Sequence, residues 1–251
     1  MNQTLDLITS TLASSLRSWR GTSASKTSNQ PKASLILFDR EACPQCRFVR
    51  EAFTELNLDV MITPCPLGGK NIKRLEKDTS NNSLPFLIDE NTEQKIQGAE
   101  SIVNYLFEQY RGKPAPKQLQ TNKLNQFASS LATGIRFNAG MIAKPSAGAE
   151  QALTLYSFES SPYSRPVREL LCELELPYLL VNLGKQQRAD MGPANFHFTL
   201  KPYKPLPSTK RDTFFQQHGN VQVPYLVDPN TGTEMFESAD IVKYLKSTYL
   251  L

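Results

Sequence analysis

The 251-residue chain has only four cysteines and two histidines, and it lacks both a long apolar run and a long basic tract. So few cysteines do not make a disulfide-stapled secreted scaffold, and a reducing compartment fits them better. No apolar run approaches the roughly 18–20 residues that span a bilayer, so we expect no transmembrane segment. The net charge of +4 is scattered along the chain, which does not indicate nucleic-acid binding.

One motif in the chain occurs twice. The stretch "EACPQCRFVRE", which begins at Glu41, returns 118 residues later as "ESSPYSRPVRE". In the second copy Ser161 replaces Cys43 and Ser164 replaces Cys46. A chain of this length buries one large core or two small ones, at roughly 100–150 residues per domain. The repeat favours two units, of which only the first keeps its sulfur atoms.

The residues around each copy predict the same order of elements. In the first unit the apolar periodicity predicts strands and helices at 33–39, 44–57, 58–64, 71–79, 84–89, 94–98 and 99–110. This order is β-α-β-α-β-β-α, with the two cysteines at the first strand-to-helix join. The second unit repeats it with an insertion between Leu183 and Gln222, which we expect to be an ordered surface excursion.

Two further segments flank the units. An apolar stripe predicts an amphipathic docking helix near the start of the chain, formed by Leu5, Ile8, Leu12, Leu16 and Trp19. The Ser/Thr/Lys-rich residues after it predict a flexible linker. A transit peptide and a membrane-surface contact are the alternatives for this helix. The sequence therefore divides into helix and linker (1–32), first unit (33–111), helical connector (112–151) and second unit (152–251).

Several motifs in register carry a resemblance to a known fold. They are C-P-x-C or S-P-x-S at the strand-to-helix turn, a proline before the third strand, "DPNTG" in the hairpin, and "ES" before the last helix. Each unit resembles a thioredoxin fold of the glutaredoxin or glutathione S-transferase N-terminal kind. The whole chain resembles the tandem glutathione S-transferase N-terminal-domain proteins of cyanobacteria and plant plastids. This implies an α/β protein with two tandem thioredoxin-like domains, each a mixed four-stranded sheet flanked by helices.

The two cysteines at the helix start have a chemistry that follows from their position. Cys43 faces free backbone N–H groups and the positive end of the helix dipole, which stabilise a thiolate and make it a nucleophile. Cys46, one turn further, is placed to resolve a mixed disulfide. Pro44 is tolerated at the first helical position, and Arg47 adds positive potential. Two inert thiols, or a metal site with Cys65 as third ligand, are the alternatives, but both histidines lie in the other unit.

The resemblance also implies where glutathione or a substrate binds. Leu84-Pro85 and Val223-Pro224 fall where such folds have a cis-proline beside the active-site turn, although a proline can also simply open a strand. In glutathione-binding relatives a Glu/Gln-Ser pair at the last helix holds the γ-glutamyl group, and Glu237-Ser238 match it, with an ordinary helix cap as the alternative. The implied binding residues are Pro44, Arg47, Leu84 and Pro85 in the first unit, and Ser161, Tyr163, Arg165, Val223, Pro224, Glu237 and Ser238 in the second.

These observations predict a glutathione- or thioredoxin-linked thiol-disulfide oxidoreductase that uses Cys43 and Cys46. Its expected partners are glutathione and disulfide-containing proteins, with no metal, in the cytoplasm or in a plastid stroma. One alternative is a non-catalytic glutathione-binding scaffold. Another is a residual glutathione transferase in which Ser161 donates a hydrogen bond to the glutathione thiolate. We expect no long helical domain after either unit, and therefore no ordinary transferase activity, because such a domain supplies the electrophile site in complete transferases.

Overall fold

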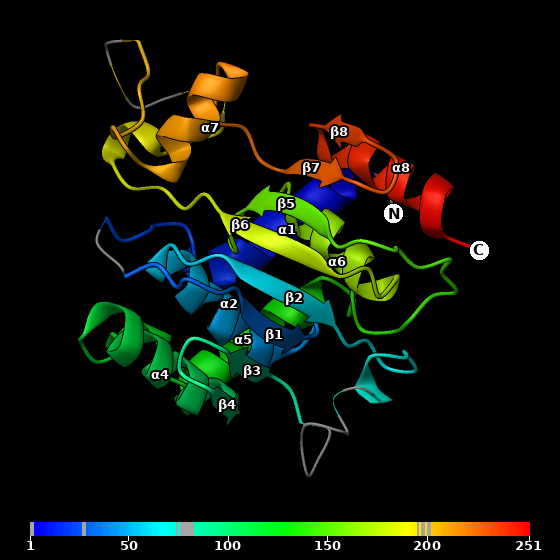
Figure 1. Cartoon of the computed structure of the whole chain (residues 1–251), viewed down its shortest axis with the longest axis horizontal. Coiled ribbons are helices and arrows are strands. Elements are labelled where there is room, and N and C mark those ends of the chain that lie inside the picture. The colour runs from blue at the N-terminus through cyan, green and yellow to red at the C-terminus, as the bar shows by residue number, and fades with distance from the viewer. Residues whose placement is uncertain are drawn as a thin grey trace.

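The protein is a mixed α/β structure, seen here in a computed structural model that describes residues 3–26, 29–73, 75, 83–194, 196, 199 and 202–251 (Figure 1). The first half contains α1 (Gln3–Leu16), β1 (Leu35–Asp39), α2 (Pro44–Leu56), β2 (Val60–Pro64), β3 (Phe86–Asp89), β4 (Gln94–Gln97) and α4 (Ala99–Arg111). The second half contains α5 (Lys123–Ile135), β5 (Leu153–Ser157), α6 (Arg165–Glu173), β6 (Tyr178–Asn182), α7 (Lys210–His218), β7 (Tyr225–Asp228), β8 (Thr233–Met235) and α8 (Ser238–Tyr249). Two short 3-10 helices are Lys117–Leu119 and Arg188–Asp190. The helix expected at 71–79 falls largely outside the described residues.

The strands form one eight-stranded sheet, in the order β4-β3-β1-β2-β6-β5-β7-β8. The expectation of two separate four-stranded sheets is therefore wrong. Strands β2 and β6 pair antiparallel at the centre, with Val60 opposite Leu180 and Ile62 opposite Tyr178 (Figure 1). Both strands would otherwise be open edges with unpaired backbone N–H and C=O groups, and their pairing satisfies these groups.

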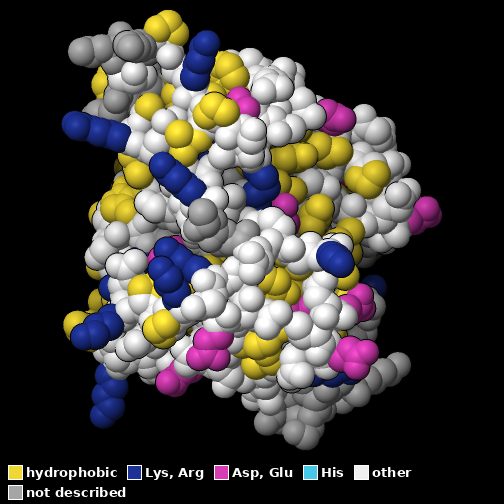
Figure 2. All heavy atoms as spheres, turned by 60° about the vertical axis from the view of Figure 1, so that its left-hand side comes forward, with side chains coloured by type: hydrophobic (Ala, Val, Ile, Leu, Met, Phe, Trp, Pro, Cys, Tyr) yellow, Lys and Arg dark blue, Asp and Glu magenta, His cyan; other side chains and the backbone are white. Residues whose placement is uncertain are grey.

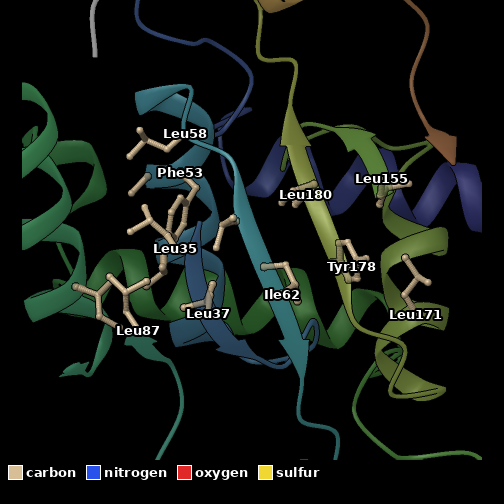
Figure 3. Close-up of a cluster of buried hydrophobic side chains, with 14 of the residues drawn as sticks. Leu35, Leu37, Phe53, Leu58, Ile62, Leu87, Leu155, Leu171, Tyr178 and Leu180 are labelled. Atoms are coloured by element: carbon tan, nitrogen blue, oxygen red, sulfur yellow. The ribbon is translucent and has the colours of Figure 1, made fainter. Parts of the chain in front are cut away.

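The hydrophobic core continues across this junction. Figure 3 shows Leu35, Leu37 and Ile62 of the first unit in line with Tyr178 and Leu180 of the second. All five side chains are at most 2% exposed and belong to one buried cluster. The two thioredoxin-like units therefore share one core as well as one sheet.

Helix α2 carries the cysteine motif and follows the pattern read from the sequence. Its predicted apolar face is buried, and it packs against α4 as α6 packs against α8. Cys43 is the N-cap and Pro44 the first helical residue, where a missing N–H is tolerated. Asn57 ends the helix in the left-handed conformation, with φ 57°.

Helices α1 and α5 are a second duplicated pair, and they lie side by side on the helical side of the sheet (Figure 1). Each is followed by a buried arginine, Arg17 or Arg136, and then by a turn in which two non-glycine residues have positive φ. The predicted helix near the start of the chain is confirmed. Its apolar stripe is exposed, however, and α1 docks through the opposite face, whose small residues are Thr9, Ser10, Ala13 and Ser14.

The segment after α1, which the sequence predicts as a flexible linker, contacts the second unit. The Ala24 N–H donates to the carbonyl of Lys185 at 2.8 Å, and the Lys185 N–H donates to the carbonyl of Thr22 at 2.8 Å. In the described part of the chain no helix is long and apolar enough to cross a bilayer. On the face seen in Figure 2, Lys and Arg side chains gather mainly on the left and Asp and Glu side chains mainly on the right.

Candidate functional site

The cysteine pair lies where the sequence places it, at the start of α2. The backbone N–H of Cys46 donates to Cys43 Sγ at 3.4 Å, so the first sulfur caps the helix. Cys43 is partly exposed and Cys46 is fully buried. One sulfur is thus open to a substrate, while its neighbour one turn away is shielded from solvent.

This geometry separates the acidities of the two thiols. The pKa of Cys43 is lowered from 9.0 to about 6. The Cys46 side chain contributes most to this shift through a hydrogen bond; burial opposes it, and the backbone N–H groups of Cys46 and Gln45 assist. Burial, followed by the same contact with Cys43, raises the pKa of Cys46 well above its usual range. At neutral pH the outer sulfur is a thiolate and the inner one a thiol.

The turn before Cys43 is held by the second unit. Arg168 of α6 donates to Glu41 Oε1 at 3.0 Å, two residues before the nucleophile. Ser129 of α5 donates to the carbonyl of Pro44 at 2.9 Å. Burial opposes the charged form of Glu41, but Arg168 and Arg50 outweigh it and lower the pKa of that carboxyl to about 2. The position of Cys43 therefore depends on both halves of the chain.

The same contacts recur with the units exchanged. Arg50 Nε donates to Glu159 Oε2 at 3.0 Å, as Arg168 donates to Glu41. All four side chains are at most 3% exposed. Sequence reasoning missed this ionic cluster. A signal for it was present, since the duplicated motif repeats the Glu and the Arg as well as the turn. A charged pair kept at both copies indicates an internal interface.

Arg47 and Arg165, both expected at a binding site, lie in this interface. Arg47 Nη1 donates to the carbonyl of Ser129 at 2.6 Å, and Arg165 Nη2 donates to Ser14 Oγ at 2.9 Å. Both arginines are at most 3% exposed. The structure therefore bonds Arg47 to α5 and Arg165 to α1 and leaves neither side chain exposed.

The second unit contains a cavity of about 740 Å³ next to Ser161. The cavity brings together most residues expected to bind glutathione there, namely Ser161, Tyr163, Val223, Pro224, Glu237 and Ser238. The Val223-Pro224 bond is cis, as is Leu84-Pro85 in the first unit, which confirms that prediction. The volume is within the range of about 300–1,000 Å³ typical of small-molecule sites.

Ser161 takes the place of the nucleophile at this second turn. Its Oγ accepts from the backbone N–H of Ser164 at 3.2 Å and is 3.0 Å from Ser164 Oγ. When Ser164 donates both hydrogen bonds, the Ser161 hydroxyl proton is free to be donated to a ligand in the cavity. A thiolate is a suitable acceptor, whereas covalent sulfur chemistry is excluded at this position.

The opposite wall of the cavity is the start of α8. Glu237 is its N-cap, with φ 65° and no side-chain cap, and its carboxylate instead accepts from Gln222 Nε2 at 2.6 Å. Glu237 therefore holds the N-cap position, as the cap alternative has it, but its side chain does not bond to the backbone of the helix. In the first unit Gly98 is the N-cap of α4, the position that Glu237 holds in α8. Ser101, where the first unit has its own "ES" pair, lies inside α4.

Cationic and apolar groups complete the cavity, and the sequence did not indicate them. Lys185 and Arg211 contribute positive charge, and burial, followed by the charge of Arg211, lowers the pKa of Lys185 to about 8. Leu7 and Trp19 reach the cavity from α1 and the turn after it. Because α1 belongs to the other end of the chain, no local pattern could have predicted this wall.

A metal site finds little support in the geometry. Among the described residues no group of three or more His, Cys, Asp or Glu side chains could hold a metal ion. His197 lies outside those residues. Cys65 is buried against Phe38, Leu75 and Phe86.

Comparison with known proteins agrees with this architecture. The family model described as "Glutathione S-transferase, N-terminal domain" matches the chain twice, over residues 37–114 and 155–250. No curated protein matches the chain, and no solved structure does. The two matched segments coincide with the two halves of the shared sheet.

Proposed function

Because the chain belongs to the glutathione S-transferase N-terminal-domain family, we propose that it is a glutathione- or thioredoxin-linked thiol-disulfide oxidoreductase. The observation that carries the proposal is the asymmetry of the cysteine pair. Cys43 is partly exposed at the N-terminus of α2 with a pKa near 6, and Cys46 is buried behind it. A pair of this kind has an attacking thiolate and a protected resolving thiol.

The reaction is a two-step exchange. The Cys43 thiolate attacks one sulfur of a disulfide, forms a mixed disulfide and expels the other sulfur as a thiolate, which takes a proton from water. Cys46 then attacks Cys43 Sγ and gives its proton to the departing substrate sulfur, which leaves as a thiol. The substrate gains two electrons and the cysteine pair becomes a disulfide. Two glutathione molecules, or a reduced thioredoxin, then return the pair to the dithiol.

We assign glutathione binding to the cavity of the second unit. Backbone N–H groups at the start of α8 and the Ser238 hydroxyl suit the γ-glutamyl carboxylate. The backbone of Val223 suits the cysteinyl part, and the Ser161 hydroxyl suits the sulfur. Lys185 is available for the carboxylate at the other end of the tripeptide. Neither Cys43 nor Cys46 lines this cavity, so glutathione bound there is separate from the two glutathione molecules that reduce the cysteine pair.

Turnover of a small disulfide in the presence of glutathione tests the redox proposal. We expect Cys43→Ser to abolish reduction and Cys46→Ser to slow reduction of protein disulfides most, because those need the resolving thiol. Cys172→Ser is the matched control, since Cys172 is a buried thiol outside the motif. Full activity of Cys43→Ser would refute the assignment. Wild type that shows no turnover and an ordinary Cys43 pKa would favour the scaffold alternative.

Binding of glutathione to the second unit is tested separately by calorimetry. Ser161→Ala and Ser238→Ala are expected to weaken binding, and Asp240→Ala, which changes an exposed residue of the same helix, is the control. The geometry of Ser161 also supports a residual transferase as a second candidate function. Conjugation that survives Cys43→Ser and is lost in Ser161→Ala would establish that candidate in place of the oxidoreductase.

A further inference from the structure

The paired helices α1 and α5 expose a large apolar surface, most of which lies outside the second-unit cavity. Its side chains are between 37% and 77% exposed and consist of Leu5, Ile8, Leu12, Leu16, Trp19, Leu124, Phe127, Leu131 and Phe137, of which Trp19 also lines that cavity. Contiguous apolar surface of this extent is rare on a monomeric protein and marks an interaction site. We infer that this surface, called here the α1/α5 face, docks onto an anionic lipid bilayer.

The α1/α5 face is a duplicated feature. Leu5, Ile8 and Leu12 of α1 recur 119 residues later as Leu124, Phe127 and Leu131 of α5. The spacing of three and four residues places each set on one side of its helix. Two helices thus present the same stripe.

The opposite sides of both helices are occupied by the body of the protein. Ser14 Oγ of α1 donates to the carbonyl of Ser160 at 2.8 Å, and Ser129 of α5 donates to that of Pro44. Arg17 and Arg136, which follow the helices, are tied to Glu51 and Glu169 at 2.7 and 2.5 Å. Since the small polar sides face the thioredoxin-like units, both stripes face away from them. A bilayer surface can therefore be contacted by both helices at once.

The charge around this face is complementary to anionic lipid. Residues 7–38 and 112–149, which contain most of α1 and all of α5, include no Asp or Glu. They carry the basic residues Arg20, Lys26, Lys32, Lys113, Lys117, Lys123 and Lys144, of which Lys144 is paired with Glu173 at 2.5 Å. The nearby carboxylates of Asp6, Glu51 and Glu169 are paired with Arg17 or Arg136. Basic residues flanking an apolar helical stripe are typical of helices that lie in a membrane interface.

A lipid surface fits this face better than a second copy of the chain. Two copies that met through it would bring their basic residues together, and like charges oppose association. Trp19 and the neighbouring Phe127 and Phe137 are aromatic side chains of the kind enriched at lipid headgroup level. Docking through the α1/α5 face requires no flexible segment to become ordered, because both helices are already packed against the rest of the protein.

Sedimentation of the full chain with vesicles tests the inference. Vesicles of phosphatidylcholine alone are compared with vesicles of phosphatidylcholine and phosphatidylglycerol in equal parts. We expect binding to the mixed vesicles that weakens as salt is added, because exposed charges are screened. In the double variant Ile8→Ser/Phe127→Ser the partition coefficient should fall at least about tenfold, since two large apolar contacts are lost. Leu251→Ser removes an exposed apolar side chain elsewhere and should bind like wild type.

Three results would overturn the inference: no binding to either vesicle, equal binding by wild type and the double variant, or a dimer that the double variant dissociates. The last result would mean that a second copy covers the face. Far-UV circular dichroism and thermal unfolding of each variant separate lost docking from lost folding. The result is independent of disulfide turnover, because Ile8 and Phe127 lie outside the cysteine site and the second-unit cavity.

Discussion

The reactivity of Cys43 as a function of pH is the most direct test of the site. If its pKa is about 6, half of the sulfur is thiolate at pH 6, against about one part in a thousand at a pKa of 9.0. This gain of about 500-fold in thiolate is partly offset, because a less basic thiolate is a weaker nucleophile. With a Brønsted slope of about 0.45, a pKa lower by three units reduces the intrinsic rate constant of the thiolate by about 20-fold. A net advantage of about 20-fold remains at pH 6.

The assay is alkylation by iodoacetamide, followed by mass spectrometry of the peptide that contains Cys43. The rate should rise with pH through about 6 and level off by about pH 8, because only the thiolate reacts. Cys46→Ala removes the largest stabilising contact, so the midpoint should move to higher pH and the rate at pH 6 should fall. Cys172→Ala should leave the midpoint unchanged. A wild-type midpoint near 8.5, the value of an ordinary cysteine, would refute the electrostatic reasoning.

Three further predictions concern stability and are measured by urea unfolding at neutral pH. Arg168→Met leaves the buried Glu41 with Arg50, 3.3 Å away, as its remaining cationic neighbour and should lower the free energy of unfolding by about 3–5 kcal/mol, part of which Glu41→Gln should restore in the double variant. Gly140→Ala should cost more than Gly148→Ala; both have positive φ, but only at Gly140 would a new Cβ lie 2.9 Å from another side chain. Tyr249→Phe removes a 2.6 Å hydrogen bond to a buried carboxylate and should cost about 1.5–3 kcal/mol. If Arg168→Met or Tyr249→Phe lowered the free energy of unfolding by less than about 0.5 kcal/mol, the structural account would be contradicted.

Local patterns predicted the elements and the turns. The Pro at the first position of α2, the apolar face of that helix and the two prolines before β3 and β7 act over a few residues, and all were read correctly. The pair Glu237-Ser238 lies at the start of α8, where the sequence placed it. Such patterns can be interpreted without knowing which distant residues the segment contacts in the folded protein.

Features that depend on distant parts of the chain were missed. The pairing of β2 with β6 joins residues such as Ile62 and Tyr178, which are far apart in the sequence, and no pattern within either strand identifies its partner. The apolar stripe of α1 predicted the helix but not which of its sides is buried. The side that packs against the protein is the one with Ser10 and Ser14, whereas the leucines of the stripe are exposed. Arg47 and Arg165 were assigned to ligand binding from the resemblance, whereas their guanidinium groups bond to Ser129 of α5 and Ser14 of α1.

The joining of the two sheets also affects how the chain avoids aggregation. A free β2 or β6 would present a hydrophobic edge, including Val60 and Ile62, to any other extended chain. In the intact protein the outermost strands are β4 and β8, which are short and carry Lys95 and Glu234 among their few residues. Charged side chains on short outer strands discourage intermolecular pairing. If either half were expressed alone, its strand β2 or β6 would be an unpaired hydrophobic edge. We expect such a half to form insoluble aggregates.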